Sequence, residues 1–268
     1  AFVDQSDSAV RYLVKGAVTP GAPGAYQSIK DGKYVANSMT RQHTAVVHGS
    51  NRLTVYVTSS TKFADAVVTS FKVGGLPAGT LGRPTWVGEQ TMLLPIGDRL
   101  YAINARSDGN WKVQAGGLVD GVGRVSAAPD GGRLALTVNG RAYVVPVIPQ
   151  GDGTVELGDR RAVDPGHDNV IDVGWSEEHR LILLNSGPRD FLRKVTIDNL
   201  QSAQLNDEGP SFPPDYLTVL CDSPADGRSE SAKVYVVVKG TLYQAESTGL
   251  RELEDAEQLP LRASAPFF

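Results

Sequence analysis

Short runs in which apolar and polar residues alternate recur along the chain, and many of them come in pairs joined by a tight turn. The clearest pair is RLALTVNGRAYVVPV, residues 133–147, which turns at Asn139-Gly140. Asn-Gly between two alternating runs is the strongest short-range signal of a β-hairpin, because a type I′ turn needs positive φ at both central residues. The pattern therefore predicts a hairpin here. A single hairpin is not stable in water and needs further strands.

Five other segments have the same form of run, turn and run. Matching positions in successive segments are 42 to 53 residues apart along the chain. A period of this length built from four short strands is typical of the blades of a β-propeller. No sustained apolar stripe with a helical period is present, so the sequence predicts an all-β fold. The five segments are 1–14, 44–57, 91–104, 180–197 and 233–246.

Each blade needs one strand before its hairpin and one strand after it. Inner strands are predicted within 34–40, 82–87, 123–129, 170–175 and 218–221, and outer strands within 66–71, 111–115, 155–159 and 250–253. No inner strand precedes the first hairpin, whereas LRASAPFF at 261–268 is left over and is similar to GRVSAAP at 123–129. We expect the C-terminal residues to supply the missing strand. The prediction is one domain, 1–268, with six four-stranded blades, and five blades as the alternative.

Tryptophan recurs at one position of the repeat. Trp86 and Trp175 precede the apolar residues Met92 and Leu181 by six residues, and Ala128 precedes Leu134 by the same number. Large rings at a repeated position are expected to fill the space between neighbouring blades. An aromatic cage for a ligand is the alternative. Asp130-Gly131-Gly132 and Glu177-Glu178-His179 are predicted as turns between the first and second strands of their blades.

Composition and charge narrow the class of protein. A hydrophobic content of 41% is ordinary for a folded domain, and a net charge of −4 argues against broad binding of nucleic acid or of anionic membranes. No apolar run reaches the ~20 residues of a membrane-spanning helix. The chain begins AFVDQSDS, without signal-peptide features, so we expect a cytosolic protein, a mature one or an excised domain. Cys221 is the single cysteine and is predicted to be a small core residue.

Motifs of enzyme chemistry are missing from the sequence. There is no nucleophile elbow, phosphate-binding loop, zinc-protease motif or dinucleotide fingerprint. His43 and His48 are five residues apart in one predicted strand, which puts them on opposite faces and prevents them from sharing a metal ion. No catalytic residue, metal site or cofactor is predicted. A propeller hydrolase with carboxylates from several blades stays open as an alternative.

Three segments carry a resemblance to a known family. They are Pro84-Thr85-Trp86 before one blade, Ala128-Pro129-Asp130-Gly131 at the next, and Val173-Gly174-Trp175 at the one after. Their order and spacing resemble the C-terminal β-propeller domain of the actinobacterial lipoprotein LpqB family. The second segment departs from the family pattern, with Ala128 in place of serine and an additional glycine.

The resemblance implies a non-enzymatic domain outside the cytoplasmic membrane. In that family an N-terminal lipid-modified cysteine and an upstream domain tether the propeller, so we expect this sequence to be a domain excised from a longer lipoprotein. The implied partners are the extracytoplasmic sensor region of the histidine kinase MtrB, whose two-component signalling would be modulated, and the protein's own upstream domain. A ligand-binding or Tol-like envelope propeller is the other binding alternative.

Long irregular loops suggest where a partner binds. The segments 21–33, 185–190 and 204–216 are longer than tight turns and rich in Pro and Gly, and we expect them to gather on one face. Aromatic residues and arginine are the types that anchor interfaces. The predicted interaction residues are Tyr26, Arg189, Asp190, Phe212 and Tyr216.

Overall fold

The hairpin predicted at 133–147 is present in the computed structural model. Strands β14 (Arg133–Val138) and β15 (Arg141–Pro149) pair antiparallel, with Val138 opposite Arg141. The turn between them has φ values of 50° at Asn139 and 77° at Gly140. Positive φ at both central residues is the type I′ signature, so this prediction is confirmed.

The structure describes most of the chain between residues 32 and 198 and short segments on either side. The described residues are 2–4, 9–13, 26–29, 32–38, 42–49, 51–58, 68–105, 110–166, 168–177, 179–186, 192–198, 202–206, 216–220, 233–238, 241–246 and 249–252. They contain strands and turns and no helix, so the all-β prediction is confirmed for them. The chain divides into two compact units, each described by itself below: the first comprises Ala1–Asp120 and Pro149–Val155, the second Gly121–Ile148 and Glu156–Phe267.

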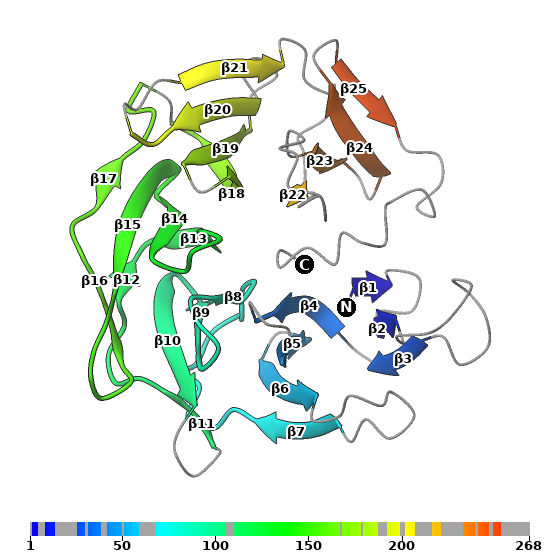
Figure 1. Ribbon diagram of the computed structural model, residues 1–268, viewed down its shortest axis with the longest axis vertical. Coiled ribbons are helices and arrows are strands. Elements are labelled where there is room, and N and C mark those ends of the chain that lie inside the picture. Colours follow the sequence, from blue (N-terminus) through cyan, green and yellow to red (C-terminus); the bar gives the residue numbers. More distant parts are fainter. Residues whose placement is uncertain are drawn as a thin grey trace. The chain divides into compact units, whose positions relative to one another are not determined.

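The first unit consists of antiparallel sheets whose strands follow one another in chain order (Figure 1). Its first sheet has the order β1-β2-β3, from β1 (Phe2–Asp4), β2 (Ala9–Leu13) and β3 (Tyr26–Ile29). The second runs β4-β5-β6-β7, from β4 (Gly32–Asn37), β5 (His43–His48), β6 (Arg52–Thr58) and β7 (Val68–Lys72). The third runs β8-β9-β10-β11, from β8 (Thr85–Trp86), β9 (Thr91–Ile96), β10 (Arg99–Ala105) and β11 (Trp111–Val113), and β12 (Val119–Asp120) also pairs with β10.

The second unit repeats the same plan. One sheet runs β13-β14-β15-β16, with β13 (Val122–Ala127) and β16 (Val155–Leu157), and β17 (Arg161–Ala162) also pairs with β15. The next runs β18-β19-β20-β21, from β18 (Val170–Glu177), β19 (Arg180–Asn185), β20 (Leu192–Thr196) and β21 (Ser202–Asn206). The last runs β22-β23-β24-β25, from β22 (Tyr216–Leu220), β23 (Lys233–Val238), β24 (Thr241–Glu246) and β25 (Gly249–Glu252).

The inner and outer strands predicted between residues 34 and 253 lie where the sequence placed them, and the outer position differs in three further ways: β3 and β21 were not predicted, and two sheets have a divided outer strand. The strand predicted within 261–268 lies outside the described residues. A single outer strand was predicted within 111–115 and within 155–159, but in both sheets the third strand pairs with two short strands in succession. Between β11 and β12 the chain passes Gly116, which has φ of 79°. A left-handed residue interrupts the regular strand, and the backbone resumes pairing when Leu118 donates to the carbonyl oxygen of Leu100 at 2.8 Å.

Each unit has its own apolar core, built where sheets pack face to face. In the first unit Val47, Leu53, Met92 and Leu94 are almost fully buried and belong to one cluster with Trp86 and Trp111. In the second, Leu181, Leu183 and Val195 cluster with Trp175. The core residues come from alternate positions of the central strands, because successive side chains of a strand point to opposite faces.

Candidate interaction surface

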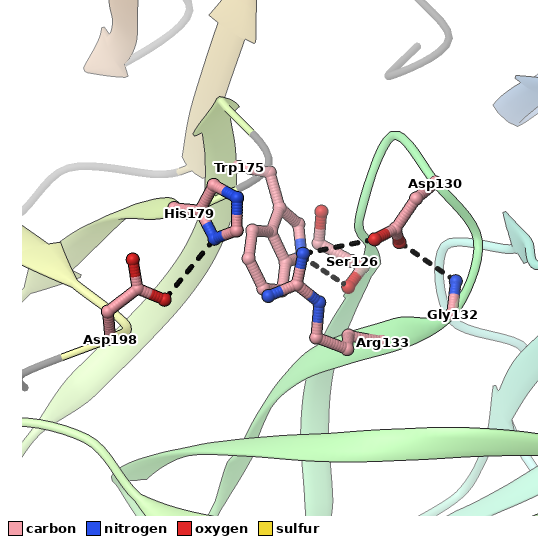
Figure 2. Close-up of polar contacts among 7 residues, drawn as sticks. All are labelled: Ser126, Asp130, Gly132, Arg133, Trp175, His179 and Asp198. Carbon is pink, nitrogen blue, oxygen red and sulfur yellow. Dashed lines mark hydrogen bonds and ion pairs between the residues drawn. The ribbon is translucent and has the colours of Figure 1, made fainter.

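Trp175 lies at the joint between two neighbouring sheets of the second unit. Its side chain is fully buried, and its indole nitrogen donates a hydrogen bond to the backbone carbonyl oxygen of Ser126 in β13 at 3.1 Å (Figure 2). The guanidinium carbon of Arg133, the first residue of β14, lies 5.4 Å from the centre of the Trp175 ring. A cation over an indole face is attracted by the ring's quadrupole. The joint is therefore stabilised by burial of the indole, by its hydrogen bond to Ser126 and by the cation–π contact with Arg133.

A carboxylate in the adjoining turn holds Arg133 in this position. Asp130 Oδ2 accepts from Nη2 of Arg133 at 3.0 Å, and Asp130 Oδ1 accepts from the backbone nitrogen of Gly132 at 2.9 Å (Figure 2). Gly131 has φ of 69°. The prediction that Asp130 is a turn residue is confirmed, and the carboxylate also orients the arginine on the tryptophan.

Trp86 forms the corresponding joint in the first unit. Its indole nitrogen donates to the backbone carbonyl oxygen of Ala36 in β4 at 3.0 Å, and the side chain is only 5% exposed. The imidazole of His43, the first residue of β5, stacks on Trp86 with centroids 5.9 Å apart and planes inclined by 26°. Trp111 of β11 meets both rings edge-on, with its centroid 5.4 Å from each of theirs.

Backbone hydrogen bonds establish that the two joints are equivalent. The nitrogen of Ser38 donates to the carbonyl oxygen of His43, and the nitrogen of Ala128 donates to that of Arg133, each at 2.8 Å and across five residues. The acceptors of the two indole groups, Ala36 and Ser126, each lie two residues before that donor. His43 and Arg133 therefore occupy one position of the repeat. The predicted packing of Trp86 and Trp175 between blades is confirmed.

One alignment in the sequence prediction was wrong by a residue. Counting six positions back from Leu134 gave Ala128 as the counterpart of the tryptophans. The register instead pairs Trp86 with Met92, Trp175 with Leu181 and Ala127 with Leu134. The additional glycine in the Asp130–Gly132 turn accounts for the shift, because it lengthens the connection between the two paired strands.

Two further pairs of charged side chains lie on the surface of the second unit. His179 Nδ1 lies 3.3 Å from Asp198 Oδ1, and both side chains are more than half exposed (Figure 2). Earlier in the chain, Arg141 Nε donates to Asp168 Oδ1 at 2.7 Å between two exposed side chains. The hydrogen bond from Arg141, followed by its positive charge, lowers the pKa of the Asp168 carboxyl.

The five predicted interaction residues fall on positions whose side chains the structure does not describe. Arg189, Asp190 and Phe212 lie outside the described residues, so their role stays a prediction. The backbone of Tyr26 and Tyr216 is described, and there the prediction of loops was wrong: Tyr26 begins β3 and Tyr216 begins β22. The Tyr26–Ile29 segment pairs with β2 and the Tyr216–Leu220 segment with β23, which fixes both as strands. The first part of the predicted loop 204–216 likewise belongs to β21.

In the part of the chain that the structure describes, no group of three or more histidine, cysteine, aspartate or glutamate side chains is arranged to hold a metal ion. No helix in that part is long and apolar enough to cross a membrane. Cys221 lies outside that part, so its place in the core stays a prediction.

Sequence reasoning missed the roles of His43 and Arg133. Both side chains rest on a tryptophan that lies more than forty residues farther along the chain, so no local pattern connects the pair. An alignment of the repeats at the turn between the first and second strands of each blade would have placed His43 and Arg133 at the same position. Each is the first residue of a largely buried strand.

The chain forms successive antiparallel sheets, most of them with a main path of four strands that follow one another in chain order. In two of them a tryptophan of the first strand donates a hydrogen bond to the first strand of the preceding sheet. This arrangement is that of a β-propeller domain. The chain belongs to the family described as the lipoprotein LpqB beta-propeller domain, whose profile matches residues 8–220. It is 28% identical over 193 residues to "Lipoprotein LpqB" of Corynebacterium jeikeium (strain K411). That alignment covers 66% of this chain and 31% of the relative, so the chain spans about a third of the relative's length.

Solved structures with low sequence identity share the fold. A chain of a structure titled "Crystal Structure of Mitotic Checkpoint Complex" has a TM-score of 0.55 and 14% identity, covering 87% of this chain and 68% of that one. Kluyveromyces lactis Hsv2 has a TM-score of 0.53 and 19% identity, covering 87% of this chain and 65% of that one. At these identities the likeness concerns the fold alone.

Proposed function

We propose that this domain is a non-enzymatic protein-interaction module of a cell-envelope lipoprotein, held outside the cytoplasmic membrane by a lipid anchor of the full protein. The observation that carries the proposal is the family match over residues 8–220. The name of the Corynebacterium jeikeium relative, a lipoprotein, supports the location.

The partner in this proposal is the extracytoplasmic sensor region of a histidine kinase, as the resemblance to the LpqB family implies for MtrB. Binding there would modulate two-component signalling. The protein's own upstream domain is a second contact. The interface would be formed by Tyr26, Arg189, Asp190, Phe212 and Tyr216, because arginine and aromatic side chains supply most of the binding energy of protein interfaces.

A binding measurement tests the partner and the surface separately. The full chain is immobilised, and the purified sensor region of the kinase from the same organism is titrated over it. We expect saturable binding by the unmodified domain. The double variant Arg189→Glu/Phe212→Ser should weaken binding at least tenfold with an unchanged melting temperature, since a single lost anchor costs at least ~1.4 kcal/mol.

The control is a double variant with the same chemistry elsewhere on the surface. Ile148→Ser/Arg251→Glu changes an exposed apolar side chain and an exposed arginine, and it should bind as the unmodified domain does. Equal binding by both double variants would contradict the proposed surface. Failure of the unmodified domain to bind would contradict the partner itself.

We also propose that the chain forms one ring of six blades, closed by its C-terminal residues. Support comes from the first sheet, whose described strands β1-β2-β3 are one fewer than the four-strand path of the sheets that follow. Residues 261–268, the strand proposed to join it beside β1, lie outside the described residues. Full closure removes two sheet edges that would otherwise pair with other chains.

Truncation tests the closure. Deleting residues 260–268 should lower the melting temperature or cause aggregation, because it removes one strand of the first blade. Deleting only Phe267 and Phe268 is the control and should have a much smaller effect. An unchanged melting temperature in the longer truncation would contradict closure by this segment, and with it the count of six.

A further inference from the structure

The two equivalent joints differ in the side chain that covers the tryptophan. In the second unit this side chain is Arg133, which carries its positive charge at every pH that proteins tolerate. In the first unit it is His43, whose side-chain type changes charge between about pH 5 and 8. The backbone hydrogen bonds place the two residues at one position of the repeat. The same kind of joint therefore has a permanently charged side chain in the second unit and a titratable side chain in the first.

Two of the groups beside His43, the Glu89 carboxylate and the face of Trp86, favour a positive charge on its imidazole. Its side chain is 17% exposed, and Nδ1 lies 3.8 Å from Glu89 Oε2 in the turn between β8 and β9. Trp86 stacks on the imidazole, whereas Trp111 meets it edge-on and completes the packing around it. The face of an indole attracts a cation held over it, and a carboxylate does so more strongly at short range, whereas a neutral imidazole gains neither attraction.

Among the described residues, the elements packed on His43 set one charged group against it. β4 ends beside it, with Ser38 accepting from the His43 backbone nitrogen at 3.1 Å, and β6 places Val57 opposite it in the ladder. On β11 the residue after Trp111 is the exposed Lys112, which alternation along the strand directs away from the buried face that carries Trp111. Glu89 is therefore the charged side chain that the described structure sets against the imidazole.

We propose that the joint between the β4–β7 sheet and the β8–β12 sheet is pH-sensitive, with protonated His43 holding the two sheets together through Glu89 and the face of the Trp86 indole. Arg133 is the permanently charged form of the same device in the second unit. Protonation tightens the first joint, and loss of the proton leaves it with packing and the Trp86–Ala36 hydrogen bond.

Melting temperatures of the full chain test whether protonated His43 stabilises this joint. The unmodified protein is compared with His43→Gln at pH 5.5 and at pH 8.0, so that all other titrating groups cancel at each pH. We expect the advantage of the unmodified protein to be larger at pH 5.5 by about 2–4 °C, the shift that an attraction of this kind gives in a domain of this size. His43→Arg, which copies Arg133, should have the same advantage over His43→Gln at both pH values.

Two further variants locate the effect. Glu89→Gln should reduce the pH-dependent part of the advantage, whereas His179→Gln, which removes an exposed histidine with its own carboxylate partner Asp198, should leave it unchanged. An advantage of the unmodified protein over His43→Gln that is the same at both pH values would overturn the proposal. So would an advantage of His43→Arg that varies with pH as the histidine does.

Tryptophan emission gives a readout that does not depend on whether the His43 variants fold. A protonated imidazole in contact with an indole quenches its fluorescence more than a neutral one does, and His43 contacts two of the three tryptophans of the chain. The unmodified protein should lose emission on acidification from pH 8.0 to pH 5.5 with its melting curve still cooperative. Emission that stays constant over this range would overturn the proposal.

Discussion

Asp164 and Arg193 form an ion pair from which solvent is nearly excluded. Arg193 Nε lies 2.5 Å from Asp164 Oδ2, and the two side chains are 12% and 8% exposed, respectively. Asp164 follows β17 at the end of one sheet, and Arg193 lies in β20 of the next. The ion pair therefore connects two sheets of the second unit, and it does so through residues other than those of the Trp175 joint.

Removing the arginine should destabilise the protein more than removing both charges. Arg193→Met leaves the Asp164 carboxylate enclosed without its cation, which costs about 3–5 kcal/mol. The double variant Asp164→Asn/Arg193→Met removes the stranded charge and should recover part of the loss, and asparagine tolerates the positive φ of 52° at this position. Urea denaturation of the three proteins measures the difference. Equal losses in the single and double variants would contradict the role of the pair.

The tryptophan joints predict a graded response to substitution. Trp86→Ala removes a buried indole from the core and should cost about 3–5 kcal/mol. Trp86→Phe keeps most of the apolar contact but leaves the Ala36 carbonyl oxygen without its donor, at a cost of about 1–3 kcal/mol. The same order is expected at Trp175. The urea midpoints of the four variants measure these losses of stability. An alanine variant that keeps its full stability but loses ligand binding would instead indicate an aromatic cage for a ligand.

How much the sequence predicted depended on how local the signal was. The type I′ turn at Asn139-Gly140 depends on two adjacent residues, and it was predicted correctly. The strand at Tyr26–Ile29 is four residues long and lies among glycines, prolines and lysines, so its composition indicated a loop; its pairing with β2 overrode that signal. The second outer strand after Gly116 was not predicted. A pair of glycines after an outer strand is equally compatible with the end of the strand and with a short interruption before pairing resumes.

The side-chain contacts that join the sheets could not be predicted, because each joins residues distant in the chain. Asp164 and Arg193 are 29 residues apart, and the nitrogen of Trp175 reaches a carbonyl 49 residues earlier. No periodicity within a strand encodes such a pair. The repeat itself is the only sequence signal for them, since a residue at a given position of one blade predicts the surroundings of its counterpart in the next.

The turn at Gly140 should not tolerate a side chain. Its φ is 77°, and an added Cβ would lie 3.3 Å from the backbone nitrogen of Asn169. Gly140→Ala should therefore destabilise the protein by about 1–2 kcal/mol, the cost of a left-handed residue with a Cβ. Gly151→Ala is the matched control, because nothing lies within 4 Å of its added Cβ, and it should be neutral or slightly stabilising. Thermal melts of the two variants would contradict the expectation if they shifted equally.

The exposed pair of Arg141 and Asp168 predicts a pH and salt effect that can be observed at one carboxyl group. Two contacts, 2.7 Å from Nε to Oδ1 and 3.4 Å from Nη2 to Oδ2, favour the ionised carboxylate and lower its pKa. Because the folded pKa lies below the unfolded one, the stabilisation is present above the ordinary aspartate value of about 3.9 and is lost as the pH falls through the folded pKa. Arg141→Gln should raise the Asp168 pKa measured by carboxyl NMR titration, and so should high salt, which screens an exposed pair. Arg251→Gln, at another exposed arginine, should leave it unchanged; an Asp168 pKa insensitive to both Arg141→Gln and salt would show that the pair does not form in solution.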